Sequence, residues 1–318
     1  MTYKKSGEIL NLNKKFFSKI GFNYLIYLIC SLIFAAVLLN LIGNTGLGNN
    51  FNVHVIITAV CNYILPFPIL LFLMRKLDSK SIEKESLSIK KFLLYFCISF
   101  TLMIIGNIIG LAITSIIGTA TQSDISNPIQ NLINSSDIML NLLIISIMGP
   151  IFEELIFRKL LIDRTVKYGA KISIILSATL FGLMHGNLNQ FFYAFLLGGF
   201  FAYVYMKTGK VIYTIMIHIF LNLIGSVLSL IVVESADALM QGSFTPFNLS
   251  ILAIYMSIIL ISLFFGLLGL LNYKKAELNN IKTEVELENP MKTVFLNYGM
   301  VCYIGFTLLI IISVTFMG

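Results

Sequence analysis

Charge is scarce in this 318-residue chain: only 12% of its residues are Asp, Glu, Lys or Arg, while 58% are hydrophobic. Soluble globular proteins carry roughly a quarter charged residues and about half apolar ones. This composition excludes a soluble, disordered or collagen-like protein, because none of these could keep so much apolar surface away from water. Lipid must therefore be the solvent for most of the chain.

Cysteine pairs and metal-binding motifs are also missing. The four cysteines, each isolated within an apolar run, are Cys30, Cys61, Cys97 and Cys302. We interpret them as small hydrophobic side chains, because none belongs to a C-x-x-C pair. The chain has no H-E-x-x-H motif either, which excludes a zinc site of the gluzincin type.

Nine apolar runs predict an all-α fold, a polytopic membrane helical bundle with about nine transmembrane helices. They cover about residues 20–43, 53–74, 92–118, 138–161, 172–187, 189–206, 211–233, 248–272 and 293–316. The runs lack the alternation of barrel strands, so helix is the spanning structure that fits them. The fifth and sixth runs are short, and we expect them to tilt or to form a tight helical hairpin.

The basic residues predict the orientation of the bundle. All 22 Lys and Arg residues lie before run one or in alternate links, whereas 44–52, 119–137, the link around 188 and 234–247 contain none. Cytoplasmic loops are rich in Lys and Arg. We therefore predict an N-terminus inside, a C-terminus outside and an external loop at 119–137. The net charge of +7 belongs to these loops, so we expect no nucleic-acid partner.

Few ionisable side chains lie inside the runs, and these form the candidate site, because each costs at least ~2–3 kcal/mol near the bilayer centre. Glu154 and Arg158 stand at i, i+4 and are expected to form a structural ion pair. Glu153 points about 100° away from Glu154 and has no partner in its own helix. It is therefore the candidate general base.

The remaining polar residues of the site come from runs five and seven. His185 follows Phe181 at i+4, so the ring can pack over the imidazole, and His218 shares a helix face with Asn222. A carboxylate, two imidazoles and an amide can activate water and hold an oxyanion. The third histidine, His54, is interpreted as an idle interfacial side chain.

A metal site is the open alternative for this set. Asn is a poor zinc ligand, but Glu153, His185 and His218 are acceptable zinc ligands by type. We predict no cofactor and leave zinc open on ligand types alone.

Three motifs, in this order, resemble those of the CPBP family, which comprises CAAX proteases and bacteriocin-processing enzymes and is also called the ABI family. Residues 153–158 (E-E-L-I-F-R) match its E-E-x-x-x-R motif, 181–185 (F-G-L-M-H) match F-x-x-x-H, and 218–222 (H-I-F-L-N) match H-x-x-x-N. The resemblance covers roughly 138–233.

The resemblance implies a catalytic core and two flanking parts. We predict that 138–233 is the core, that 1–137 supplies an N-terminal tail and three flanking helices, and that 234–318 supplies two more. Lys159 departs from the family pattern, in which a small residue often follows the motif arginine, and this places local packing in question.

The resemblance also implies an intramembrane endopeptidase with a cavity open to the cytosolic side. Glu153 would activate water with help from His185, and His218 with Asn222 would stabilise the tetrahedral oxyanion. Glu154 and Arg158, together with Phe181, would orient the site. The family includes metal-dependent and glutamate-dependent mechanisms, and the glutamate mechanism agrees with the chemistry of these residues.

The expected substrate is a peptide or a lipidated protein segment, reached from the membrane or the cytosolic face. The abundance of Ile, Asn and Lys favours a bacterial source and hence a multi-pass protein of the bacterial plasma membrane. Two alternatives remain: a proton-coupled transporter, although no inverted repeat supports it, and a non-enzymatic bacteriocin-immunity or scaffold protein of the same fold. Neither the natural substrate nor the oligomeric state follows from the sequence.

The sequence places the site residues at different depths in the membrane. At ~1.5 Å per residue, Glu153 and His218 lie about 10 Å from the cytosolic ends of their runs, whereas His185 lies about 20 Å from Lys171. Run five must therefore begin deeper in the cytosol, tilt strongly or form a half-hairpin.

Overall fold

The computed structural model describes residues 2–43, 45–122, 137–272 and 281–317, together with 125, 133 and 135. All regular elements among these residues are helical, which confirms the all-α class. The α-helices are α1 (Thr2–Gly43), α2 (Phe51–Ala59), α3 (Pro66–Met74), α4 (Ile89–Thr121), α6 (Ile138–Leu140), α7 (Gly149–Glu154), α8 (Leu161–Thr165), α9 (Ala170–Met184), α10 (Leu188–Thr208), α11 (Val211–Asn222), α12 (Ser229–Met240), α13 (Pro246–Leu271), α14 (Pro290–Phe295) and α15 (Tyr298–Met317). Most of the predicted external loop at 119–137 lies outside the described residues.

Short segments of other helix types join these α-helices into longer rods. The π-helical segments are Val60–Ile64, Asn141–Met148, Leu155–Leu160 and Leu223–Leu228, and a 3₁₀ turn covers Val166–Tyr168.

Eight rods within the described part of the chain are long and apolar enough to cross a membrane, so the protein is a multi-pass helical bundle. They are Asn11–Gly43, Phe51–Met74, Ile89–Thr121, Ile138–Tyr168, Leu188–Thr208, Val211–Met240, Pro246–Leu271 and Tyr298–Phe316. The remaining predicted span, 172–187, corresponds to α9, which has only 15 residues. A full span needs about 20 residues, so α9 is the short member of the bundle.

The predicted orientation does not depend on whether α9 crosses the membrane completely. α9 and α10 pack against each other as a hairpin. The two ends of the hairpin that lie away from its turn carry basic residues, Lys171 at the start of α9 and Lys207 at the end of α10. The chain therefore returns to the side on which the hairpin began, and an inside N-terminus with an outside C-terminus stays a prediction.

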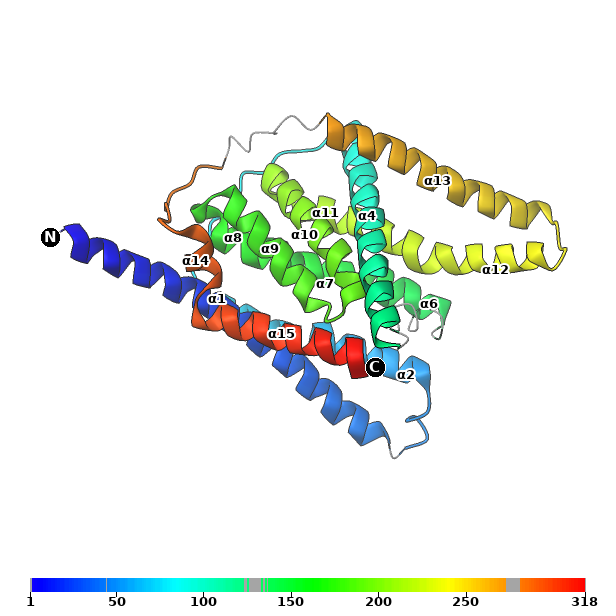
Figure 1. Cartoon of the computed structure of the whole chain (residues 1–318), viewed down its shortest axis with the longest axis horizontal. Helices are drawn as coiled ribbons and strands as arrows, with labels where there is room; N and C mark the ends of the chain where they lie inside the picture. Colours follow the sequence, from blue (N-terminus) through cyan, green and yellow to red (C-terminus); the bar gives the residue numbers. More distant parts are fainter. Residues whose placement is uncertain are drawn as a thin grey trace.

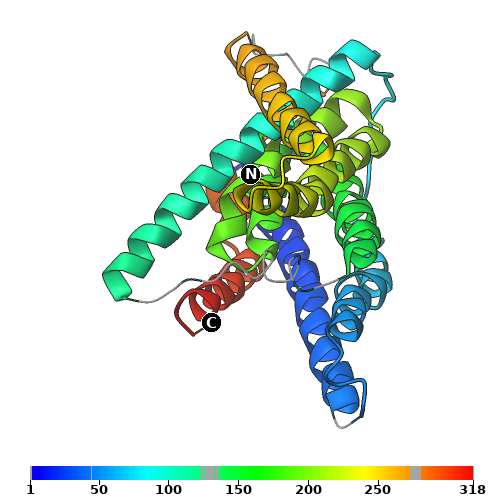
Figure 2. The ribbon, with the colours of Figure 1, turned by 90° about the vertical axis from the view of Figure 1, so that its right-hand side faces the viewer.

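α10 packs on α4, α9 and α11. α4 crosses the other long helices obliquely and packs on α10 and α13, while α1 and α15 lie side by side (Figure 1 and Figure 2). The N-terminus, α8 and α14 lie at the left of Figure 1, whereas α2, α6 and the far end of α12 lie at the right.

Buried tyrosines attach the flanking helices to the helices of the site. Tyr24 of α1 donates a 2.7 Å hydrogen bond to the carbonyl oxygen of Ile156, and Tyr303 of α15 donates a 3.0 Å hydrogen bond to that of Leu180. Helices in lipid associate through close packing and interhelical hydrogen bonds. The flanking helices therefore support the core, although the boundaries at 137/138 and 233/234 stay predictions.

Two glycines bring α1 and α15 into backbone contact. A Cβ atom on Gly21 would lie 2.3 Å from the carbonyl carbon of Gly299, and one on Gly299 would lie 1.9 Å from the carbonyl oxygen of Ser18. The Gly299 amide donates a 2.9 Å hydrogen bond to the Ser18 hydroxyl. Small residues are what permits this approach between membrane helices.

We predict that Gly21→Ala lowers the midpoint of thermal unfolding in detergent, because overpacking against a backbone costs about 1–3 kcal/mol. The matched control is Gly305→Ala on α15, where an added Cβ meets nothing within 4 Å. Equal midpoints for the two variants would show that the α1–α15 contact does not stabilise the fold.

Candidate active site

Glu153 and His185 are separated by the same number of residues from the turn at Gly169, which lies between their helices. The helix that carries Glu153 does not end at 161, as the apolar run predicts, but continues to Tyr168. Gly169, with φ of +95°, then turns the chain into α9. Glu153 and His185 each lie 16 positions from Gly169, so they reach a similar height on packed helices. This removes the mismatch in depth that the sequence suggested.

Hydropathy missed the last turns of this helix because Asp163 and Arg164, which look solvated in the sequence, are buried and hydrogen-bonded. The Lys159 ammonium lies 2.6 Å from a carboxylate oxygen of Asp163, whose other oxygen accepts a 2.6 Å hydrogen bond from Tyr205. Arg164 donates to the carbonyl oxygens of Met74 and Leu160. The Lys159 that departs from the family pattern thus belongs to an ion pair at the end of the helix.

Each π-helical segment contains or adjoins a polar residue of the site. Tyr63 lies within 60–64, Arg158 lies within 155–160, and Asn222 immediately precedes 223–228. The segment 141–148 leads into α7, which carries Glu153. A π-bulge shifts the helix register and is frequent at functional sites.

The buried ion pair expected from the sequence is present. Nε of Arg158 lies 3.1 Å from Oε2 of Glu154, and both side chains are completely buried. The guanidinium carbon lies 4.4 Å from the ring centroid of Phe181 and 5.3 Å from that of Phe201. Among the described residues its nitrogens have no well-directed hydrogen bond. Two aromatic faces and one carboxylate therefore surround this cation.

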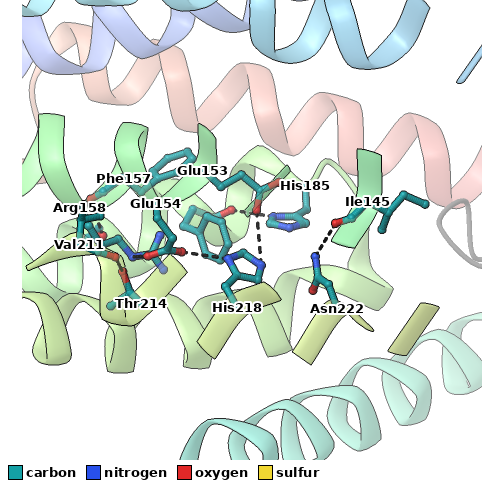
Figure 3. A network of polar contacts seen from close by, with 12 residues as sticks. Ile145, Glu153, Glu154, Phe157, Arg158, His185, Val211, Thr214, His218 and Asn222 are labelled. Atoms are coloured by element: carbon teal, nitrogen blue, oxygen red, sulfur yellow. Dashed lines mark hydrogen bonds and ion pairs between the residues drawn. The ribbon is translucent and has the colours of Figure 1, made fainter. Parts of the chain in front are cut away.

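His218 joins the two glutamates (Figure 3). Its Nδ1 lies 3.0 Å from Oε1 of Glu154, and its Nε2 lies 3.7 Å from Oε2 of Glu153. A carboxylate only accepts hydrogen bonds, so an ionised Glu154 keeps the proton on Nδ1. The Nε2 atom is thereby directed at the candidate base.

Glu153 is held from its other side by Tyr63, a residue that the sequence did not single out. The Tyr63 hydroxyl donates a 2.7 Å hydrogen bond to Oε1 of Glu153, and its ring stacks on Phe152 at 5.6 Å. The other carboxylate oxygen of Glu153, Oε2, faces His218. The only signal in the sequence is that Asn62 and Tyr63 interrupt an otherwise apolar run.

His185 has a defined acceptor atom. Its Nδ1 lies 2.9 Å from the carbonyl oxygen of Phe181, which can only accept, so Nδ1 carries the proton and the neutral ring has its lone pair on Nε2. The Phe181 ring packs edge-on against the imidazole at 4.9 Å, as the i+4 spacing predicts.

Asn222 keeps one amide proton for a ligand. Its Nδ2 donates a 2.9 Å hydrogen bond to the carbonyl oxygen of Ile145, and an amide nitrogen has two protons. His54 does not join the site: its Nε2 bonds to the carbonyl oxygen of Gly48.

One cavity of about 720 Å³ connects these groups, and its lining includes Glu153, His185, His218 and Asn222. Tyr63 also lines it, whereas Glu154 and Arg158 lie behind its wall. The structure thus separates a reactive set that faces the cavity from a buried pair that supports it.

The structure adds no support to the zinc alternative. Among the described residues no group of three or more His, Cys, Asp or Glu side chains has an arrangement that could hold a metal ion.

The candidate site thus combines carboxylates and imidazoles inside a multi-pass helical bundle. Residues 135–224 match the family described as Rce1-like, type II CAAX prenyl endopeptidase. The chain therefore carries a domain of this CAAX protease family.

One bacterial relative supports the assignment. The curated protein named "Putative membrane peptidase YdiL", from Bacillus subtilis (strain 168), is 28% identical over 108 residues. The match covers 34% of this chain and 43% of that protein, so less than half of the relative is matched. Among solved structures, none matches the chain.

We predict that Arg158→Met strongly destabilises the protein in detergent, because an unpaired buried Glu154 costs about 3–5 kcal/mol. Lys80→Met is the matched control: its ammonium pairs with Glu284 at the exposed surface, where an ion pair is worth about 1 kcal/mol or less. Unfolding midpoints measured side by side decide the point, and similar midpoints would contradict it.

Proposed function

We propose that this protein is an intramembrane endopeptidase of the bacterial plasma membrane in which Glu153 activates water to cleave a peptide or a lipidated protein segment. The observation that carries the proposal is the position of Glu153: Tyr63 holds one carboxylate oxygen at 2.7 Å, and the other oxygen faces Nε2 of His218 across 3.7 Å. A separation of this size suits a bridging water.

The hydrogen-bond directions support a division of roles. Glu153 takes a proton from water while the water oxygen attacks the peptide carbonyl carbon. The Nε2 lone pair of His185 accepts from the same water. The proton then passes to the departing amine as the C–N bond breaks.

The oxyanion receives two donors in this mechanism, the free amide proton of Asn222 and the Nε2 proton of His218. Since Glu154 already engages Nδ1, His218 donates through Nε2 only when its ring carries both protons. The negative charge of the oxyanion formed beside it then balances the positive charge of the ring. The buried Glu154–Arg158 pair thereby acts on the reaction through His218.

We expect Glu153→Ala and His185→Ala to abolish peptide cleavage by purified protein in detergent while insertion and folding persist, because loss of a general base costs about 10²–10⁴-fold. His54→Ala is the control, since His54 lies outside the cavity. Cleavage that survives Glu153→Ala would falsify the mechanism. Activity lost with a chelator and restored by zinc, or uptake driven by a pH gradient without proteolysis, would also contradict the proposal.

Tyr63→Phe tests how the base is positioned. Removing the hydroxyl frees Glu153 to rotate, and small misplacements of a catalytic group cost about 10–100-fold, so kcat should fall by that factor with KM unchanged. Tyr255→Phe is the matched control, because Tyr255 lines the same cavity from α13. If both variants keep the parental kcat, Tyr63 does not position Glu153.

A further inference from the structure

The cavity of the site lies toward the end of the bundle that lacks basic residues. Its lining residues come mainly from the helix halves that adjoin loops without Lys or Arg. Some lie in the first half of a helix that follows such a loop, and others lie in the second half of a helix that leads into one. Representative lining residues are Thr58, Ile144 and Tyr255 in the first group and Leu230 and Val233 in the second, while Asn107 lies near the middle of α4. Ile133, within the link that lacks Lys and Arg, also lines the cavity.

A second cavity repeats this placement. It has a volume of about 310 Å³, shares His185 with the larger cavity and lies between α1, α15 and the α9–α10 turn. Asn187 in that turn and Val314 near the end of α15 both line it. Both cavities therefore extend from the catalytic residues in the same direction.

The basic end of the bundle is closed by packed structure. No residue between 158 and 168 lines the larger cavity. The segment that follows α3 crosses this end, where the Lys80 amide donates to the Asp163 carbonyl oxygen at 2.6 Å and the Glu85 amide to that of Thr208 at 2.8 Å. The Glu284 amide adds a 2.9 Å hydrogen bond to the Lys167 carbonyl oxygen.

We infer that substrate and water reach Glu153 from the end of the bundle without basic residues, which is the outer face by the positive-inside rule. This differs from the cytosolic access implied by the family resemblance, and it rests on the proposed function. The substrate is then a peptide segment presented from the outer aqueous phase or the outer half of the bilayer.

The chemistry of the cavity wall narrows the substrate further. No Lys or Arg of the described chain lines the cavity, and its one carboxylate is Glu153. The wall is mostly apolar, and its neutral polar groups are hydroxyls and the amides of Asn62, Asn107, Gln190 and Asn222. Such a wall accepts an apolar, neutral peptide segment and disfavours an acidic one, because a second carboxylate would have to be desolvated beside Glu153.

Accessibility from each side of the membrane tests the inference. In a background without the four native cysteines, Thr58→Cys and Asn107→Cys report on the cavity. Lys84→Cys on the basic segment and Ser243→Cys on the link after α12 serve as controls for the two faces. Each variant is treated with a membrane-impermeant cationic methanethiosulfonate, first on spheroplasts and then on inside-out vesicles.

We expect residues 58, 107 and 243 to be labelled in spheroplasts and residue 84 only in inside-out vesicles. Labelling of residues 58 and 107 only in inside-out vesicles, or from neither side, would overturn the inference. Labelling of residue 84 in spheroplasts, with residue 243 labelled only in inside-out vesicles, would overturn it as well. Labelling needs no turnover, so a failure here is distinguishable from a failure of the proposed function, which the Glu153→Ala assay reports separately.

Discussion

The buried ion pair between Glu154 and Arg158 is the constraint on which the site depends. A guanidinium without water must be neutralised and enclosed, and here Glu154 supplies the charge while the faces of Phe181 and Phe201 enclose it. In the proposed mechanism the pair serves the reaction through His218, because Glu154 also binds Nδ1 of that ring. One costly buried charge thus fixes the histidine that faces the candidate base.

The site also requires that side chains from different helices lie at the same depth in the bundle, and the turn at Gly169 provides this. Gly169 turns the chain between two helices on which Glu153 and His185 are equally spaced. The π-helical segments adjust the register beside Tyr63, Arg158 and Asn222. The flanking helices α1 and α15 add buried tyrosine hydrogen bonds to the backbone of these two helices.

Much of this architecture could be predicted from composition and spacing. The shortage of charge indicates the helical bundle, and i, i+4 spacing indicates the Glu154–Arg158 pair and the packing of Phe181 on His185. The helix end at 161 was wrong because Asp163 and Arg164 look like solvated residues in the sequence but are paired and buried. Tyr63 could not be found, since its contact with Glu153 joins residues 90 positions apart, and local patterns carry no such information.

The central claim is that Glu153 activates a water molecule and does not itself attack the peptide. A single turnover in ¹⁸O-labelled water, followed by mass spectrometry of the product, tests this claim most directly. Attack by activated water places one ¹⁸O atom in the new carboxyl group during the first turnover. A first-turnover product that carries only ¹⁶O, taken from the enzyme carboxylate through an acyl intermediate on Glu153, would contradict the account.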